Sequence, residues 1–251
     1  MSFWPQGYSR QVHAELDSTN AEARRQAEAE SETGGAEHGS LWIMAERQTA
    51  GRGRRGRAWQ TAEGNLAATL LLRPDAPQSV TGQLSFAAAL ATADMAAHFA
   101  PNAAIAVKWP NDVLAEGKKL AGILLEGGAD KSNKAWLAIG IGVNLASHPD
   151  GTEFPATSLA GLGIAAPSPE DALTILAARF AHWYAVWMKT GFETVRTAWL
   201  ARAKGVGAPI RARLATHETR TGVFEGIDAN GALLLNEQGQ VRAIAAGEVF
   251  F

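Results

Sequence analysis

The most informative absence in this chain of 251 residues is that of cysteine. Without a thiol the protein has no disulfide, no zinc–thiolate site and no cysteine nucleophile. The sequence also has no run of eighteen apolar residues, and Met1–Pro5 lacks the charged segment and apolar core of a signal peptide. These absences predict a cytoplasmic protein with no membrane partner.

The chain also lacks an excess of charge of either sign, because 23 basic residues nearly balance 25 acidic ones and the formal net charge is −2. This balance argues against nucleic acid as the main partner. The six histidines form no pair at metal-binding spacing, and the sequence contains neither a P-loop nor a Gly-x-Ser-x-Gly elbow. A nucleotide would therefore be held by other residues, and no serine nucleophile is indicated.

What the sequence does contain is a basic loop, Gly51–Arg57, in which four arginines alternate with three glycines. Apolar runs at 41–45 and 65–72 flank it, which predicts a loop between two buried strands. Glycines permit close backbone approach and arginines match phosphate or carboxylate oxygens, so a phosphate site, an RNA patch and a solvated loop all fit. The glycine spacing also matches a dinucleotide fingerprint. Arginines between the glycines and the absence of a following helix exclude that interpretation.

Hydrophobic patterning predicts an α+β protein with strands and helices up to about residue 204. Asp17–Asn20 offers capping oxygens to a helix reaching about Glu30, with Thr19 and Glu22 at capping-box spacing and Gly34-Gly35 as its break. Further strands are expected at 11–16, 105–109, 113–115, 120–126 and 135–145. Further helices are expected at 80–99, 169–189 and 192–203. The three tryptophans of the last two helices are expected in the core.

Short alternating strands between Ile210 and Ala245 follow a linker at Gly205–Pro209. Such a series predicts a compact β-barrel. We therefore expect two domains, residues 1–204 and 205–251.

Five polar segments occur in a fixed order between residues 17 and 144: Asp17–Asn20, Gly51–Trp59, Lys108–Asp112, Lys119–Leu124 and Gly140–Asn144. Together they resemble the motifs of the biotin–protein ligases, and residues 231–235 and 247–248 resemble the C-terminal domain of that family. The resemblance covers nearly the whole chain. It implies a mixed β-sheet catalytic domain of the class II synthetase-like type, followed by a small SH3-like β-barrel.

The resemblance also implies a reaction in two steps. The carboxylate of biotin attacks the α-phosphate of ATP, which gives biotinyl-5′-adenylate and pyrophosphate, and a lysine of a biotin carboxyl carrier domain then displaces AMP. ATP with Mg²⁺ would be the co-substrate. Because two anions must meet, positive charge is needed but a protein nucleophile is not.

By the same resemblance, Lys119, Arg54 and Arg52 would be catalytic. The biotin contacts would be Ser18, Thr19, Asn20, Gln48, Arg52, Gly53, Arg54 and Lys119. The nucleotide contacts would be Arg52, Arg54, Trp59, Lys108, Asn111, Asp112 and Asn144.

For several residues the sequence leaves more than one role open. Arg55 and Arg57 either assist or are solvated, and Lys118 is expected on the opposite, solvated strand face. Asp112 would hold Mg²⁺, orient Lys119 or pair with an arginine. The hydroxyls of Ser18 and Thr19 also suit a helix cap, and Asn144 also suits a turn at a strand end.

About ten residues precede the first expected strand, so we expect a monofunctional ligase without the DNA-binding module that many members of the family carry. A lipoate or octanoate attachment enzyme is the nearest alternative enzyme, and an RNA-binding module is the alternative without enzymatic activity. The sequence leaves a monomer and a homodimer both open.

Overall fold

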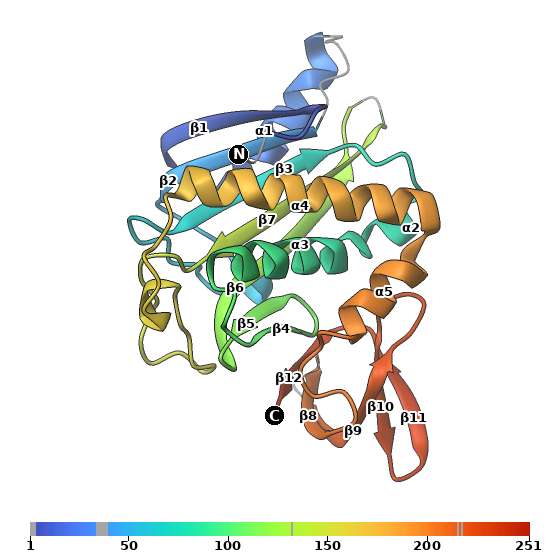
Figure 1. Cartoon of the computed structure of the whole chain (residues 1–251). Helices are drawn as coiled ribbons and strands as arrows, with labels where there is room; N and C mark the ends of the chain where they lie inside the picture. Colours follow the sequence, from blue (N-terminus) through green and yellow to red (C-terminus); the bar gives the residue numbers. More distant parts are fainter. Residues whose placement is uncertain (1–3, 34–39, 132, 215, 217) are drawn as a thin grey trace.

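The computed structural model describes residues 4–33, 40–131, 133–214, 216 and 218–251. Its largest element is a mixed seven-stranded sheet of order β1-β2-β3-β7-β6-β5-β4, in which β1 and β2 are parallel and the other neighbours antiparallel (Figure 1). The strands are β1 (Tyr8–Leu16), β2 (Ser40–Gln48), β3 (Leu66–Leu72), β4 (Ile105–Lys108), β5 (Asp112–Ala115), β6 (Lys118–Ala129) and β7 (Ala135–Val143). Among the residues that the structure describes, no helix is long and apolar enough to cross a membrane.

Helices cover both faces of this sheet. The helices α3 (Leu84–Phe99) and α4 (Pro169–Thr190) pack on one face, and α1 (Thr19–Thr33) packs on the other (Figure 1). Along β2 the side chains alternate, so that Trp42 and Met44 join the α3–α4 core while Leu41 and Ile43 face α1. Burial on both faces explains why the strands are continuous apolar runs.

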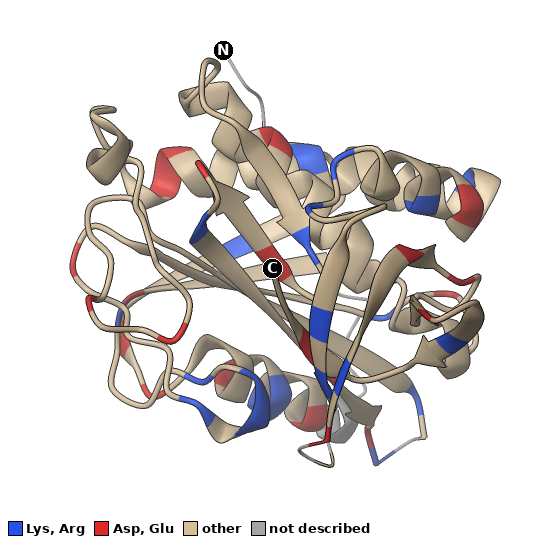
Figure 2. Cartoon of the chain, turned by 90° about the horizontal axis from the view of Figure 1, so that it is seen from below, with Lys and Arg blue, Asp and Glu red and all other residues tan. Residues whose placement is uncertain are grey.

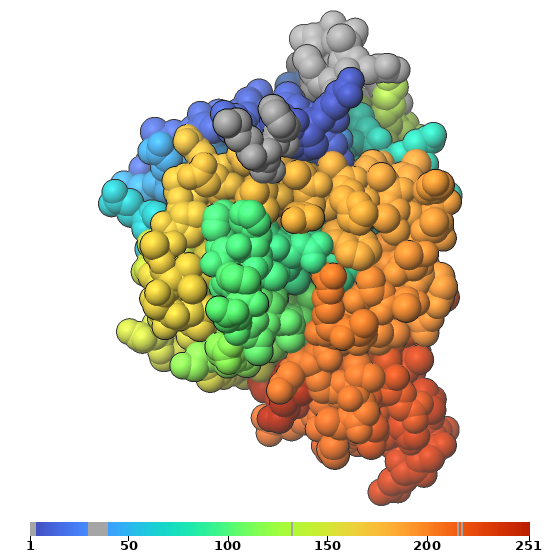
Figure 3. All heavy atoms as spheres, in the orientation of Figure 1, coloured from blue at the N-terminus to red at the C-terminus, as the bar shows by residue number. Residues whose placement is uncertain are grey.

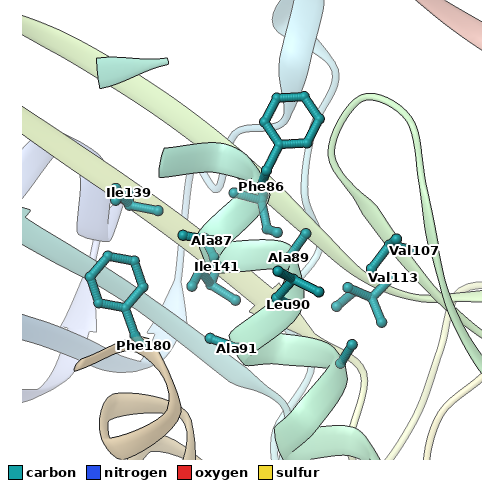
Figure 4. Packing of buried hydrophobic residues seen from close by; sticks show 14 of the residues in the cluster. Phe86, Ala87, Ala89, Leu90, Ala91, Val107, Val113, Ile139, Ile141 and Phe180 are labelled. Atoms are coloured by element: carbon teal, nitrogen blue, oxygen red, sulfur yellow. The ribbon is translucent and has the colours of Figure 1, made fainter. Parts of the chain in front are cut away.

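The main core lies between the sheet and α3. Alanines of α3 lie in one buried cluster with Ile139 and Ile141 of β7, and Phe180 of α4 belongs to the same cluster (Figure 4). Helix α3 begins at Leu84 and not at Val80 as predicted, because Gln78–Thr81 form a separate short helix, α2. The tryptophans at 183, 187 and 199 are buried in this core, as predicted.

Helix α1 lacks the capping box that the sequence predicts. The amide of Glu22 donates to the carbonyl of Ser18, so Ser18 is the residue before the first turn. The hydroxyl of Thr19 contacts Gln48 instead, and the carboxylate of Glu22 accepts from Arg25 and Gln26. The Gly34-Gly35 break lies outside the described residues. The capping-box prediction for Thr19 and Glu22 was wrong, because Thr19 is already the first residue of the helix and its hydroxyl contacts Gln48 and Thr69.

The C-terminal residues form a second sheet of order β11-β10-β9-β8-β12, attached below α5 (Phe192–Leu200) (Figures 1 and 3). Its strands are β8 (Pro209–Leu214), β9 (Thr219–Ile227), β10 (Leu233–Glu237), β11 (Gln240–Ile244) and β12 (Gly247–Phe250). Over the described residues no ladder joins β11 to β12, so the expected barrel is an open antiparallel sheet. The last strand, β12, was not predicted.

The two sheets meet at the end of β4. The indole N–H of the buried Trp109 donates to the carbonyl of Gly231 at 3.0 Å, and the backbone of Val107 bonds to Arg202 and Lys204. These contacts bring β12 alongside the ends of β4 and β5.

Candidate active site

A cavity of about 480 Å³ opens on the face of the large sheet that α1 covers only in part. Its volume lies in the range of small-molecule sites. All thirteen residues named from the sequence contribute to its wall: Ser18, Thr19, Asn20, Gln48, Arg52, Gly53, Arg54, Trp59, Lys108, Asn111, Asp112, Lys119 and Asn144. Segments far apart in the chain therefore converge on one space.

One end of the cavity is a hydrogen-bonded polar cluster at the start of α1. The amide N–H of Thr19 donates to Oε1 of Gln48 at 2.8 Å, and the hydroxyl of Thr69 lies 2.6 Å from Oδ1 of Asn20. The amide group of Asn20 donates to Glu126 at 2.7 Å. Because the partners fix the direction of each amide, this end presents both donors and acceptors to a ligand.

Two glycines of β7 make room for side chains that form the cavity wall. A Cβ atom on Gly142 would lie 2.3 Å from the Trp59 indole, and one on Gly140 would lie 2.1 Å from Oδ1 of Asn20. The Trp59 ring also lies against Gly122 of β6, where a Cβ would come within 3.1 Å. The indole therefore forms an apolar wall that needs glycine at these strand positions.

Two lysines share one carboxylate at the other end. The Nζ of Lys119 lies 2.7 Å from Oδ1 of Asp112, and the Nζ of Lys108 lies 3.8 Å from its Oδ2. Lys108 is only 3% exposed. Burial lowers the pKa of Lys108 to about 8; the attraction of Asp112 opposes this effect and the charge of Lys119 adds to it.

The strand ends explain this grouping. Lys108 ends β4 and Asp112 begins the antiparallel β5, so the two residues face each other across the connection. Lys119 lies on β6 opposite Leu114, while its exposed neighbour Lys118 has the solvated position expected of it. Asn111 and Asn144 are tied by their side-chain amides to the carbonyls of Ile123 and Thr157.

The basic loop is a small hairpin whose tip, Arg54–Gly56, forms one 3₁₀ turn and opens no α-helix. Gly53 and Arg57 are joined by a backbone hydrogen bond, as are Gly51 and Trp59, and Gly56 has φ of +72°, which favours glycine. This geometry agrees with exclusion of a dinucleotide fingerprint. The loop joins β2 to β3, as predicted.

The arginines of this loop contact three other elements. Arg54 donates to Oδ1 of Asn111 at 3.1 Å, and burial together with Arg55 lowers its pKa from the ordinary value. Arg52 lies 3.6 Å from Glu126. Arg57 reaches Glu248 of β12 at 2.8 Å, and Arg55 lies 3.8 Å from the same carboxylate.

Glu248 is therefore the acidic centre of the loop's contact with the C-terminal sheet. Arg213 of β8 contacts it at 2.5 Å and also makes a bidentate pair with Glu153. Burial alone would raise the pKa of Glu248, but hydrogen bonds from Arg213 and Arg57 outweigh that effect and bring the pKa to about 2. The carboxylate stays ionised at neutral pH.

Comparisons with known proteins agree with this arrangement. Residues 15–144 match the biotin/lipoate A/B protein ligase family, and residues 205–251 match the biotin protein ligase C-terminal domain. The chain is 47% identical to a biotin–[acetyl-CoA-carboxylase] ligase of Paracoccus denitrificans, over 95% of this chain and 98% of that protein. The chain belongs to the biotin protein ligase family.

Two further relatives support the assignment to this family. A biotin–[acetyl-CoA-carboxylase] ligase of Mycobacterium tuberculosis is 35% identical over 95% of this chain and 87% of its own length. The structure of a biotin protein ligase from Aquifex aeolicus in complex with biotin and ATP has a TM-score of 0.78 at 24% identity, covering 96% of this chain and 97% of that one. The latter likeness establishes the family fold.

Sequence reasoning missed several residues of this site. Thr69 and Glu126 carry no motif signal beyond a polar residue in an apolar strand, and Glu153 and Phe154 lie in an irregular segment. Glu248 was noted only as part of a C-terminal motif. Both Arg55 and Arg57 of the basic loop contact this carboxylate.

Proposed function

We propose that this chain is an ATP-dependent biotin–protein ligase that forms biotinyl-5′-adenylate and then transfers biotin to a lysine of a carrier domain. The observation that carries the proposal is the convergence of the thirteen named residues on one cavity. This cavity has one end lined by hydroxyl and amide groups and one cationic end, which is what a ligand with a ureido ring and a carboxylate requires.

The polar end fits the ureido ring of biotin. Ser18, Thr19 and Gln48 offer hydroxyl and amide groups, and Asn20 is oriented by Glu126. The Trp59 indole over Gly122 and Gly142 offers an apolar surface for the ring system and the aliphatic chain. Gly53 would let the loop backbone approach the ligand.

The cationic end fits the reacting anions. Lys119 would contact the biotin carboxylate and then the α-phosphate, while Arg52, Arg54 and Lys108 would offset the repulsion between carboxylate and triphosphate. Asp112 would hold the Lys119 ammonium group in place, given the 2.7 Å contact. Asn111 would orient Arg54, and Asn144 would line the nucleotide side.

In the first step an oxygen of the biotin carboxylate bonds to the α-phosphorus, and the bond to the pyrophosphate oxygen breaks. In the second step the unprotonated amine of the carrier lysine bonds to the acyl carbon, AMP leaves and one proton is released. Neither step requires a covalent bond to the protein. The residues of this chain act by position and charge.

The donor set at Asp112 does not fit a resident Mg²⁺. Both carboxylate oxygens of Asp112 face ammonium groups, and no group of three or more acidic or histidine side chains among the described residues is placed to hold a metal. We therefore propose that Mg²⁺ enters bound to the phosphates of ATP and that Asp112 is an orienting residue.

The other expectations join this proposal. We propose residues 1–204 as the catalytic domain and 205–251 as a second domain that contributes Glu248 to the cavity wall. The acceptor is a biotin carboxyl carrier domain, and because the reaction consumes ATP we place it in the cytoplasm.

Lipoate attachment is the second candidate, because the matching family model includes lipoate ligases. The match of residues 205–251 to a biotin ligase C-terminal domain favours biotin. An RNA-binding role for the loop is disfavoured, because three of its arginines are paired with carboxylates of this chain. Figure 2 shows basic and acidic segments interspersed on the side of the C-terminal sheet.

The test is ATP–pyrophosphate exchange with biotin, lipoate or octanoate as the only acid present. Exchange with biotin alone is expected. A carrier domain is then added, and its mass is expected to rise by one biotinyl group at a single lysine. Exchange with lipoate alone would refute the proposal in favour of the second candidate.

A further inference from the structure

The buried ammonium group of Lys108 lies against an aromatic ring. Its Nζ is 2.9 Å from the ring centroid of Phe154 and 3.8 Å from Asp112. The negative face of an aromatic ring attracts a cation, and this attraction is strongest where water is excluded. Lys108 is almost fully buried, so the ring face is an electrostatic partner as well as a packing surface.

The Phe154 ring is held from two sides. The amide of Lys119 donates to the carbonyl of Pro155 at 2.8 Å, and the amide of Thr157 donates back to the carbonyl of Lys119 at 2.9 Å. The segment after Phe154 is thus tied to the backbone of Lys119. On the other side, the Phe154 ring stacks on Phe250 of β12, with centroids 4.8 Å apart and planes at 23°.

The Phe250 ring is itself held by cations of the C-terminal sheet. The guanidinium carbons of Arg211 and Arg213 lie 5.0 and 4.8 Å from its centroid. Arg213 also pairs with Glu153, the neighbour of Phe154. A continuous series of contacts therefore runs from β8 and β12 through two rings to the ammonium group in the cavity.

We infer that Phe154 is a positioning residue, whose ring face, supported by Phe250, holds the Lys108 ammonium group at the cavity wall for the reacting phosphates. This inference rests on the proposed function, and it assigns the C-terminal sheet a direct part in adenylation. Asp112 attracts the same ammonium group and Lys119 repels it, and Glu248 and Glu153 attract it more weakly. Because Asp112 also serves Lys119, the ring supplies attraction without drawing this carboxylate away.

Ring fluorination separates electrostatics from packing, because fluorine withdraws electron density from the ring face with little change in shape. We expect kcat/KM for ATP in biotin-dependent pyrophosphate exchange to fall stepwise with 4-fluoro-, 3,5-difluoro- and 3,4,5-trifluorophenylalanine at position 154. The total loss should be roughly two- to thirtyfold. Phe154→Leu should lose at least as much, and Phe154→Tyr should retain most activity.

The control is the same fluorinated series at Phe192, whose ring faces Phe86 in the core and no cation of the site. No graded loss is expected there. Phe250→Leu should give a loss smaller than that of Phe154→Leu. A loss in Phe154→Leu without any gradient in the fluorinated series would overturn the inference, since packing alone would then explain the contact.

A spectroscopic measurement on the ligand-free protein tests the geometry without any activity. A ring face at this distance shifts the ε-methylene protons of Lys108 upfield, and the signal is assigned by its loss in Lys108→Met. We expect the shift in the wild type and in Phe154→Tyr but not in Phe154→Leu. Its absence from the wild type would overturn the inference. A protein that shows the shift but exchanges no pyrophosphate would refute the proposed function alone.

Discussion

Replacing Lys108 by methionine tests whether the site carries a charge at the expense of folding stability. The side chain is 3% exposed at the end of β4. Burial lowers its pKa from 10.5 to about 8, with repulsion by Lys119 in the same direction and attraction by Asp112 against it. Methionine keeps most of the aliphatic stem and removes the charge, and Asp112 remains paired with Lys119.

The magnitude follows from the two pKa values. Between pH 8 and pH 10.5 the unfolded chain holds this proton and the folded protein does not, so the stability of the wild type rises with pH through that window. At about 1.4 kcal/mol per pH unit, the cost at pH 7 is about 3 kcal/mol. Lys108→Met should be more stable by up to that amount at pH 7, with the gain shrinking towards zero near pH 10.5.

Urea unfolding at pH 7, 8.5 and 10 measures this difference, and Lys118→Met at an exposed position of β6 is the matched control. The control should change the free energy of unfolding by less than about 0.5 kcal/mol at every pH. Pyrophosphate exchange by Lys108→Met should fall even though the protein is more stable. A gain that does not vary with pH, or no gain at pH 7, would refute the assignment of the cost to the buried charge.

Three further substitutions test individual contacts of the site. Lys119→Ala should keep the melting temperature within a few degrees but lower pyrophosphate exchange by about 10² to 10³, the range for loss of one preorganised charge; full exchange would remove Lys119 from the site. Arg54→Ala should speed release of biotinyl-5′-adenylate by about ten- to a hundredfold, as read by filter binding of the labelled intermediate; an unchanged release rate contradicts its role. Gly142→Ala places a Cβ 2.3 Å from the Trp59 indole, so KM for biotin should rise about tenfold with altered tryptophan fluorescence.

Much of the cavity could be predicted from the chain because its residues interrupt apolar strands at their ends. Lys108, Asp112 and Asn144 each lie at or next to the end of a strand, where a polar group is conspicuous. Buried strands place such ends beside one another only when the sheet order is known. The family resemblance grouped these residues into one site without giving the sheet order, and hydrophobic patterning alone supplied only the strands and helices.

The contacts between the C-terminal sheet and the cavity could not be predicted from the sequence, for a physical reason. Phe154 meets Phe250, and Glu248 meets Arg57, only because the second sheet docks at the end of β4 through Trp109 and Gly231. No periodicity within either segment records this docking. The prediction of a closed barrel was wrong for a similar reason. Strand patterns specify which face is buried, but they do not specify whether β11 pairs with β12.

The glycines of β7 show how much a sequence pattern predicts and what only the structure supplies. Gly140 and Gly142 lie two residues apart, so both face the same side of the sheet as Ala138, which packs towards α1. Neither has a positive φ, and each is instead required for space, since a Cβ would strike Asn20 or Trp59. A Gly-x-Gly within an apolar strand therefore predicts that some group approaches the backbone closely. The identity of that group depends on α1 and on the basic loop, which bring an amide and an indole to the wall of the cavity on this face.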